Sequence, residues 1–89
     1  MNNDINKVFV SVIVPMYNKE GTIIRCLESL SEQKLKELEI IVIDDGSTDK
    51  SKELVEKYQK RDNRIKLISQ ENRGPGAARN VGIKAASGE

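Results

Sequence analysis

The stretch Glu39-Ile-Ile-Val-Ile-Asp-Asp-Gly-Ser-Thr-Asp49 decides the fold of this chain. Its four consecutive aliphatic residues, 40–43, are typical of a strand that is buried on both faces of a parallel sheet. The run stops at Asp44 and Asp45, which are followed by a glycine and by polar residues that can cap a helix. The two acids therefore lie where a strand ends and a helix begins. In open α/β sheets this edge binds ligands.

Length and composition limit what the chain can be. Its 89 residues allow one small domain, which we expect to span residues 8–89 after a flexible, polar N-terminus at residues 1–7. The 15 Lys and Arg residues nearly balance the 14 Asp and Glu residues, which argues against nucleic acid as a partner. The absence of His excludes a His-based metal site, and the single cysteine excludes an internal disulfide. We expect that cysteine, Cys26, to be buried on a helix.

The first apolar run, residues 8–14, is too short and too interrupted to be a signal sequence or a membrane span. We therefore expect a cytoplasmic protein, and a location at the cytoplasmic face of a membrane is compatible with this expectation.

Apolar runs and amphipathic stretches alternate along the chain. Strands are predicted at residues 8–14 (ended by Pro15), 39–43 and 64–69. Helices are predicted at residues 22–33, 48–60 and 77–86. Right-handed connections of this length give parallel strands in the order third, second, first, so the first strand lies at an edge that no later strand of the chain covers. The predicted fold class is α/β, with an open, mostly parallel sheet.

Several segments resemble the family-two glycosyltransferases of GT-A fold, in the family's order and spacing. They are Val10-Ser-Val-Ile-Val-Pro-Met-Tyr-Asn18, Glu20, Cys26-Leu-Glu-Ser-Leu30, Glu39 to Asp49, Asn72-Arg-Gly-Pro-Gly-Ala-Ala-Arg-Asn-Val-Gly82 and Ala86-Ser-Gly-Glu89. The resemblance covers nearly all of the chain from Val10 onward. It implies a Rossmann-like βαβαβα half of a GT-A domain that binds a nucleotide-diphospho-sugar.

The same resemblance implies an inverting sugar transfer from a nucleotide-diphospho-sugar, with UDP as the expected nucleotide and Mg²⁺ or Mn²⁺ as the expected metal of the full-length enzyme. In the family, the metal-holding Asp-x-Asp motif follows the Ala-x-Gly-Glu segment, and the catalytic base lies further on. We therefore expect neither metal ligands nor catalytic residues in this chain, and we expect the 89-residue segment alone to be inactive. The sugar, the acceptor and the linkage cannot be read from it.

Seven positions are candidates for nucleotide contacts, some from the resemblance and some from their own chemistry: Pro15, Tyr17, Glu20, Asp44, Asp45, Gly74 and Arg79. Asp45 resembles the family aspartate that accepts the uracil N3–H, although an Asp-Gly pair is also common in a simple capped turn. Asp44 could contact the ribose or hold its loop by accepting backbone N–H groups.

Tyr17 resembles the family aromatic residue that packs against the base, with a plain surface tyrosine as the alternative. Pro15 is expected to stop the strand and to shape the wall of the site, and in the family a carbonyl near this position contacts the base. Glu20 resembles a family acid next to the nucleotide, but an acid in the first turn of a helix needs no such role. Lys19 and Arg73 are expected to face solvent.

Gly74 and Gly76 open the third predicted helix, where glycine lets the backbone approach a ligand closely and the helix N-terminus suits an anion. Arg79 could pair with a phosphate or with a carboxylate such as Asp44, and the alternative is a solvated arginine on a helix-start loop. The segment matches neither the dinucleotide fingerprint nor the P-loop.

Two other classes of protein stay open. The unpaired edge of the first strand favours a non-enzymatic α/β module that associates with a second copy, which would give a homodimer or a marginally stable segment. A receiver domain also places paired acids at a strand end, but here the second helix begins too soon after Asp45, and the glycine-rich loop has no role.

Overall fold

The computed structural model describes residues 10–33 and 37–86. The predicted flexible N-terminus at residues 1–7, the predicted strand start at residue 8 and the last residues of the Ala86-Ser-Gly-Glu89 segment lie outside the described residues.

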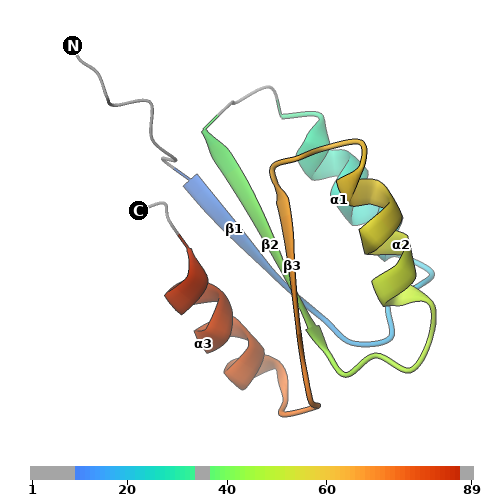
Figure 1. Ribbon diagram of the computed structural model, residues 1–89, viewed down its shortest axis with the longest axis vertical. Helices are drawn as coiled ribbons and strands as arrows, with labels where there is room; N and C mark the ends of the chain where they lie inside the picture. Colours follow the sequence, from blue (N-terminus) through green and yellow to red (C-terminus); the bar gives the residue numbers. More distant parts are fainter. Residues whose placement is uncertain (1–9, 34–36, 87–89) are drawn as a thin grey trace.

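Strands and helices alternate as the sequence predicts. The elements are β1 (Val10–Met16), α1 (Ile23–Ser31), β2 (Leu38–Asp45), α2 (Ser51–Gln59), β3 (Ile65–Gln70) and α3 (Pro75–Ala85). The strands form one parallel sheet in the order β1-β2-β3, which confirms the predicted order. Figure 1 shows α1 and α2 on one face of this sheet and α3 on the other.

The central strand β2 is buried along its whole length. Its alternate residues Leu38, Ile40 and Val42 face the larger part of the core, which they form with side chains of α1, α2 and β3. Ile41 and Ile43 face the other side and pack against α3. Because β2 has both a strand on each side and side chains on each face, its aliphatic run is the framework of the fold.

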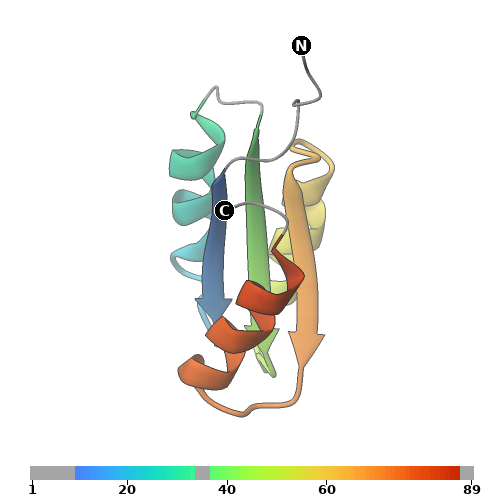
Figure 2. The ribbon, with the colours of Figure 1, turned by 90° about the vertical axis from the view of Figure 1, so that its left-hand side faces the viewer.

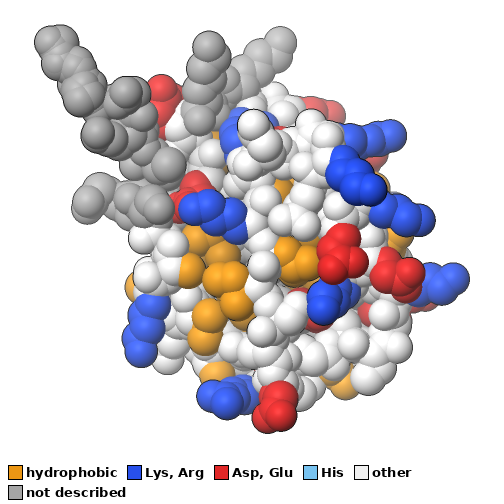
Figure 3. Space-filling view, in the orientation of Figure 1, with side chains coloured by type: hydrophobic (Ala, Val, Ile, Leu, Met, Phe, Trp, Pro, Cys, Tyr) orange, Lys and Arg blue, Asp and Glu red, His pale blue; other side chains and the backbone are white. Residues whose placement is uncertain are grey.

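The face under α3 is less completely covered than the face under α1 and α2. Only Ala78 of α3 joins Ile41 and Ile43 in a fully buried cluster, while Ile13, Ile68 and Val81 are partly buried. Figure 2 shows α3 crossing this face alone. In Figure 3 hydrophobic side chains reach the surface between charged groups on the side of the molecule that carries α3.

Two strand ends differ from the prediction. β1 continues through Pro15 to Met16, although the prediction stopped it at Pro15. An edge strand tolerates proline because alternate N–H groups face away from the neighbouring strand. β2 continues to Asp45, which pairs in register with Gln70 of β3, so both acids belong to the strand rather than to the turn.

The helix starts also shift, for local reasons. α2 begins at Ser51 instead of residue 48, because residues 47–49 form a loop that is hydrogen-bonded to the segment after β1. α3 begins two residues before the predicted start, at Pro75. Proline suits the first turn of a helix, where its missing N–H would have no partner inside the helix.

The prediction for Cys26 is wrong, because its side chain is exposed. The buried residues of α1 are Ile23 and Leu27, and Ile24 and Leu30 are partly buried beside them. Cys26 lies on the flank of this stripe that faces solvent.

One charged side chain lies inside the sheet at the amino ends of the strands. Glu39 of β2 is only 2% exposed, and it faces the same side as Ile41 and Ile43. Ser11 of β1 donates a hydrogen bond of 2.8 Å to its carboxylate, and Lys66 of β3 forms an ion pair with it. This polar contact links all three strands at the end of the sheet opposite to Asp45.

Among the described residues, no helix combines the length and the apolar character that crossing a bilayer requires.

α3 approaches the sheet most closely at Gly82. A Cβ atom at this position would lie 2.5 Å from Cγ2 of Ile13, whereas a Cβ atom at Gly76 in the same helix would meet nothing within 4 Å. The contact therefore needs a residue without a side chain.

We expect Gly82→Ala to lower the free energy of unfolding by about 1–3 kcal/mol, because overpacking outweighs the better helix propensity of alanine. The matched variant Gly76→Ala should be neutral or more stable by up to about 1 kcal/mol. Urea unfolding followed by circular dichroism measures both. Equal stabilisation by the two substitutions would show that α3 does not sit this close to β1.

Candidate functional site

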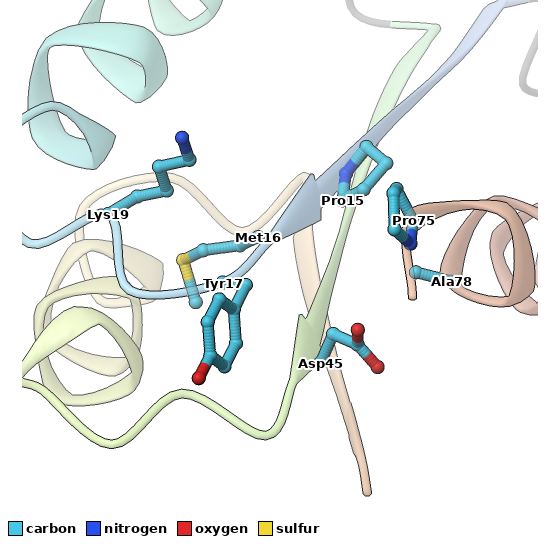
Figure 4. A pocket seen from close by; sticks show the side chains of 7 residues that line it. All are labelled: Pro15, Met16, Tyr17, Lys19, Asp45, Pro75 and Ala78. Carbon is cyan, nitrogen blue, oxygen red and sulfur yellow. The ribbon is translucent and has the colours of Figure 1, made fainter. Parts of the chain in front are cut away.

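The carboxyl ends of the strands and the start of α3 surround a cavity of about 320 Å³. It is lined by Pro15, Met16, Tyr17, Lys19, Asp45, Pro75 and Ala78 (Figure 4). This is the edge of the sheet at which the sequence predicts a ligand site. Pro15, Tyr17 and Asp45 were predicted site residues, and the structure brings them to one cavity.

Asp45 is the buried charged group of this cavity, with 4% of its surface exposed. One carboxylate oxygen accepts hydrogen bonds from Nε2 of Gln70 (2.9 Å) and the backbone N–H of Arg73 (2.8 Å). The other oxygen accepts one from the backbone N–H of Gly74 (2.8 Å). The two backbone hydrogen bonds fasten the loop between β3 and α3 to Asp45. A carboxylate has about four acceptor positions, so three accepted bonds leave a count of one.

Asp45 is held in its ionised form. The hydrogen bond from Gln70 lowers the pKa of this carboxyl, the backbone N–H of Arg73 lowers it further, and together with Gly74 they outweigh the opposing effect of burial. The cavity therefore presents a hydrogen-bond acceptor rather than a carboxylic acid.

Tyr17 is 44% exposed and follows β1 directly. Figure 4 shows the ring of Tyr17 on one side of the end of β2 and the carboxylate of Asp45 on the other, turned toward α3. Both side chains line the cavity, but they do not point at each other.

Lys19, Met16, Pro75 and Ala78 also line the cavity, and none of them was predicted to be a site residue. Lys19 is exposed, as expected, and it borders the cavity as well. Met16 belongs to the hydrophobic core. The sequence prediction ended the first strand at Pro15 and therefore left Met16 outside the strand. Pro75 could have been predicted as a lining residue. Proline is common in the first turn of a helix, and the start of α3 borders the edge of the sheet at which the site was expected.

Asp44 does not line this cavity. It is 3% exposed, and its carboxylate accepts the backbone N–H of Ser47 at 3.1 Å. Of the two roles considered for it, the structure contains the one in which Asp44 holds its own loop.

Glu20 is engaged by the start of α2. Its Oε1 atom accepts the backbone N–H of Lys50 at 2.8 Å, and its own backbone N–H donates to Asp49 at 3.1 Å. Burial alone would raise the pKa of Asp49, but hydrogen bonds from Ser51 and Glu20 lower it below its ordinary value. Glu20 does not line the cavity.

The two predicted residues of the third loop differ in their surroundings. Gly74 has a φ of 96° and donates its N–H to Asp45, so the backbone conformation by itself favours glycine there. Arg79 is exposed on α3. No hydrogen bond or ion pair joins its guanidinium to another residue of the described segments, so the expected alternative of a clamp to Asp44 is absent from them.

No group of three or more Cys, Asp or Glu side chains within residues 10–33 and 37–86 is arranged as a set of metal ligands. The described residues therefore do not fit the Mg²⁺ or Mn²⁺ that the resemblance implies for the full-length enzyme.

Comparison with known proteins identifies the family. The model of Glycosyl transferase family 2 matches residues 11–89. The chain belongs to this family. It is 54% identical over 80 residues to the Putative glycosyltransferase EpsH of Bacillus subtilis (strain 168), and the match covers 90% of this chain and 23% of that protein.

Solved structures of glycosyltransferases have the same fold. S. aureus TarS 1–349 in complex with UDP-GlcNAc is 44% identical, with a TM-score of 0.82 over 91% of this chain and 24% of that one. The mannosyltransferase PcManGT from Pyrobaculum calidifontis, in complex with GDP-Man and Mn²⁺, is 32% identical, with a TM-score of 0.85 over 93% of this chain and 26% of that one. The predicted Rossmann-like half of a GT-A domain is confirmed. The chain spans about a quarter of the length of these proteins.

We expect the carboxyl of Asp45 to titrate below the ordinary value of 3.8, as measured by ¹³C NMR of its side-chain carbon. Gln70→Leu removes the largest lowering contribution, so the pKa should rise toward that value. Ser69→Ala, an exposed neighbour in β3, is the control and should leave the titration unchanged.

The sign of the effect on stability follows from the lowered pKa. The contribution of Asp45 is fully present above the unfolded-state pKa and is lost as the pH falls through the folded-state pKa. Below pH 3.8 the native chain should therefore lose stability more steeply than the Gln70→Leu variant. Identical acid unfolding of the two would contradict the assignment.

Proposed function

We propose that the protein acts as an inverting glycosyltransferase whose donor is a UDP-sugar, and that this chain binds the nucleotide. One observation carries the proposal: the buried carboxylate of Asp45, which accepts three hydrogen bonds, borders a cavity that Tyr17 also lines. Because the chain spans about a quarter of the relatives' length, the activity, the donor and the partners of the whole protein are all part of the proposal.

The hydrogen-bonding groups on the edge of the base explain why a carboxylate would favour uracil over cytosine. Uracil presents an N3–H donor, which Asp45 can accept at its remaining position, whereas cytosine presents an acceptor at N3 and would leave the carboxylate facing a lone pair. A charge-assisted hydrogen bond of this kind contributes about 1.5–3 kcal/mol. Tyr17 would stack on the base, which contributes about 1–3 kcal/mol in comparable contacts.

One relative supports this choice of ligand, since TarS was solved with UDP-GlcNAc. Another relative, PcManGT, was solved with GDP-Man and Mn²⁺. Guanine also carries an N–H donor beside a carbonyl, so a GDP-sugar is the competing donor that the experiment has to exclude.

The remaining predicted residues receive roles at the rim of the site. Pro15 would contact the base through its backbone, and the loop at Gly74 would face the nucleotide from the side of α3. The exposed guanidinium of Arg79 would pair with the diphosphate. Glu20 and Asp44 are proposed to act on the nucleotide only through the loops that they hold. This chain's part in the reaction is to bind and orient the donor, and the expected cytoplasmic location belongs to the same proposal.

Isothermal titration of the chain with UDP, UMP, CMP, GDP and NAD tests the choice of ligand. We expect UDP to bind and CMP and NAD to be silent, because among these bases only uracil and guanine offer a ring N–H donor beside a carbonyl, which is the group that Asp45 is proposed to accept. GDP binding with UDP silent would overturn the donor assignment, and NAD binding alone would overturn the family role of the cavity.

Two pairs of variants test the residues. Asp45→Asn should weaken UDP binding by about 10- to 150-fold, the equivalent of 1.5–3 kcal/mol, and should reduce the preference for UDP over CDP. Glu56→Gln removes an acid from the exposed face of α2 and should bind like the native chain. Tyr17→Ala should weaken binding while Tyr17→Phe retains it, because the ring and not the hydroxyl does the stacking. Unchanged UDP/CDP discrimination in Asp45→Asn would refute the role of the carboxylate.

The edge of β1 supports a second candidate, an association module. Within the described residues β1 pairs only with β2, and Val10 at its start is 40% exposed. A free, apolar strand edge can pair with another copy. We expect the chain to dimerise or to be marginally stable, as measured by sedimentation equilibrium and by thermal melts at several concentrations. A cooperative, concentration-independent melt of a monomer would count against it.

A further inference from the structure

The segment after β1 is fastened to the segment between β2 and α2 by side chains that do not line the cavity. Oδ1 of Asn18 accepts the backbone N–H of Thr48 at 2.7 Å and that of Asp49 at 3.3 Å, and it also accepts the Thr48 hydroxyl at 3.3 Å. In return, the backbone N–H of Asn18 donates to Oγ of Ser47 at 3.0 Å. One side chain thus joins two loops that are about thirty residues apart in sequence.

The backbone of Asn18 is unusual in a way that agrees with this role. Its φ is 51°, and it is the only residue other than glycine among those described that has a positive φ. Asparagine tolerates this region better than other residues, but the conformation still needs support from its surroundings. The reciprocal bonds with residues 47–49 supply that support.

The next residues along the chain continue the same attachment. The backbone N–H of Lys19 donates to Oγ of Ser51 at 2.6 Å, and Glu20 exchanges hydrogen bonds with Asp49 and Lys50. Tyr17 directly precedes this fastened segment, is 44% exposed and makes no hydrogen bond of its own within the described residues. Its backbone is therefore held by β1 on one side and by this fastened segment on the other.

We infer that Asn18 is a positioning residue for the nucleotide site, which holds Tyr17 against the cavity by locking the two loops together. The inference rests on the proposed function where it is tested by UDP binding. In this role the side-chain amide of Asn18 does not contact the nucleotide. It lowers the entropic cost of binding, because Tyr17 is already ordered before the base arrives.

Variants at Asn18 separate the amide from the backbone. Asn18→Gly accepts the positive φ but removes the acceptor, and Asn18→Asp keeps an acceptor at the same place. We expect UDP affinity to fall about tenfold in Asn18→Gly and to stay within about twofold of the native value in Asn18→Asp. Gly21→Ala, in the same loop and with nothing within 4 Å of the added methyl group, is the matched control.

A double-mutant cycle tests whether Asn18 acts through Tyr17. If it does, Asn18→Gly should weaken UDP binding much less in a Tyr17→Ala background than in the native one. Equal, additive losses would mean that Asn18 matters for the fold or contacts the ligand itself, and either result would overturn the inference.

A second measurement needs no ligand, so it tests the role of Asn18 even if the proposed nucleotide binding is wrong. ¹⁵N relaxation should show the backbone amide of Tyr17 as rigid in the native chain, with an order parameter near about 0.85, and as flexible in Asn18→Gly, below about 0.6. The amides of β2 should be unchanged. Should Asn18→Gly fail to fold, Ser47→Ala removes only the returning bond and should loosen Tyr17 in the same direction. An equally rigid Tyr17 in the folded variants would refute the role of Asn18, whether or not UDP binds.

Discussion

The burial of β2 on both faces and along both edges is the constraint on which the other features depend. Every residue of this strand is buried, including the two acids at its carboxyl end. A strand that is packed on all sides cannot shift without opening the core, so the place of Asp45 is fixed by the aliphatic residues before it. The neighbouring strands end in register with it, which brings three connecting segments to one edge of the sheet.

Asp45 joins this framework to the chemistry of the site. It accepts one hydrogen bond from Gln70 at the end of β3 and two from backbone N–H groups of the loop before α3, and these bonds keep its carboxylate ionised. The same group is therefore a structural anchor and the acceptor that we propose for the base. Its orientation is set before any ligand arrives, as preorganised recognition requires.

The sequence predicts the parts of the structure that depend on periodicity and chain connection. The run at residues 40–43 predicted the central strand, and the handedness of the crossovers predicted the strand order. The family resemblance placed Pro15, Tyr17 and Asp45 at one cavity. The bonds of Glu20 and Asn18 were not predicted, because their partners lie about thirty residues away and no local pattern records them. The exposure of Cys26 was missed because the width of a buried helical stripe depends on how the neighbouring helix packs.

The buried Glu39 favours the native register of the strands over other registers. The apolar runs of β1 and β2 are similar enough that other alignments would also bring aliphatic side chains together. A slip of β2 by one residue would turn Glu39 away from Ser11 and Lys66 and into the layer that packs on α1 and α2. An uncompensated carboxylate would then be desolvated among hydrocarbon groups. A single acid at one end of the sheet thus penalises misaligned chains during folding and protects the geometry at the other end.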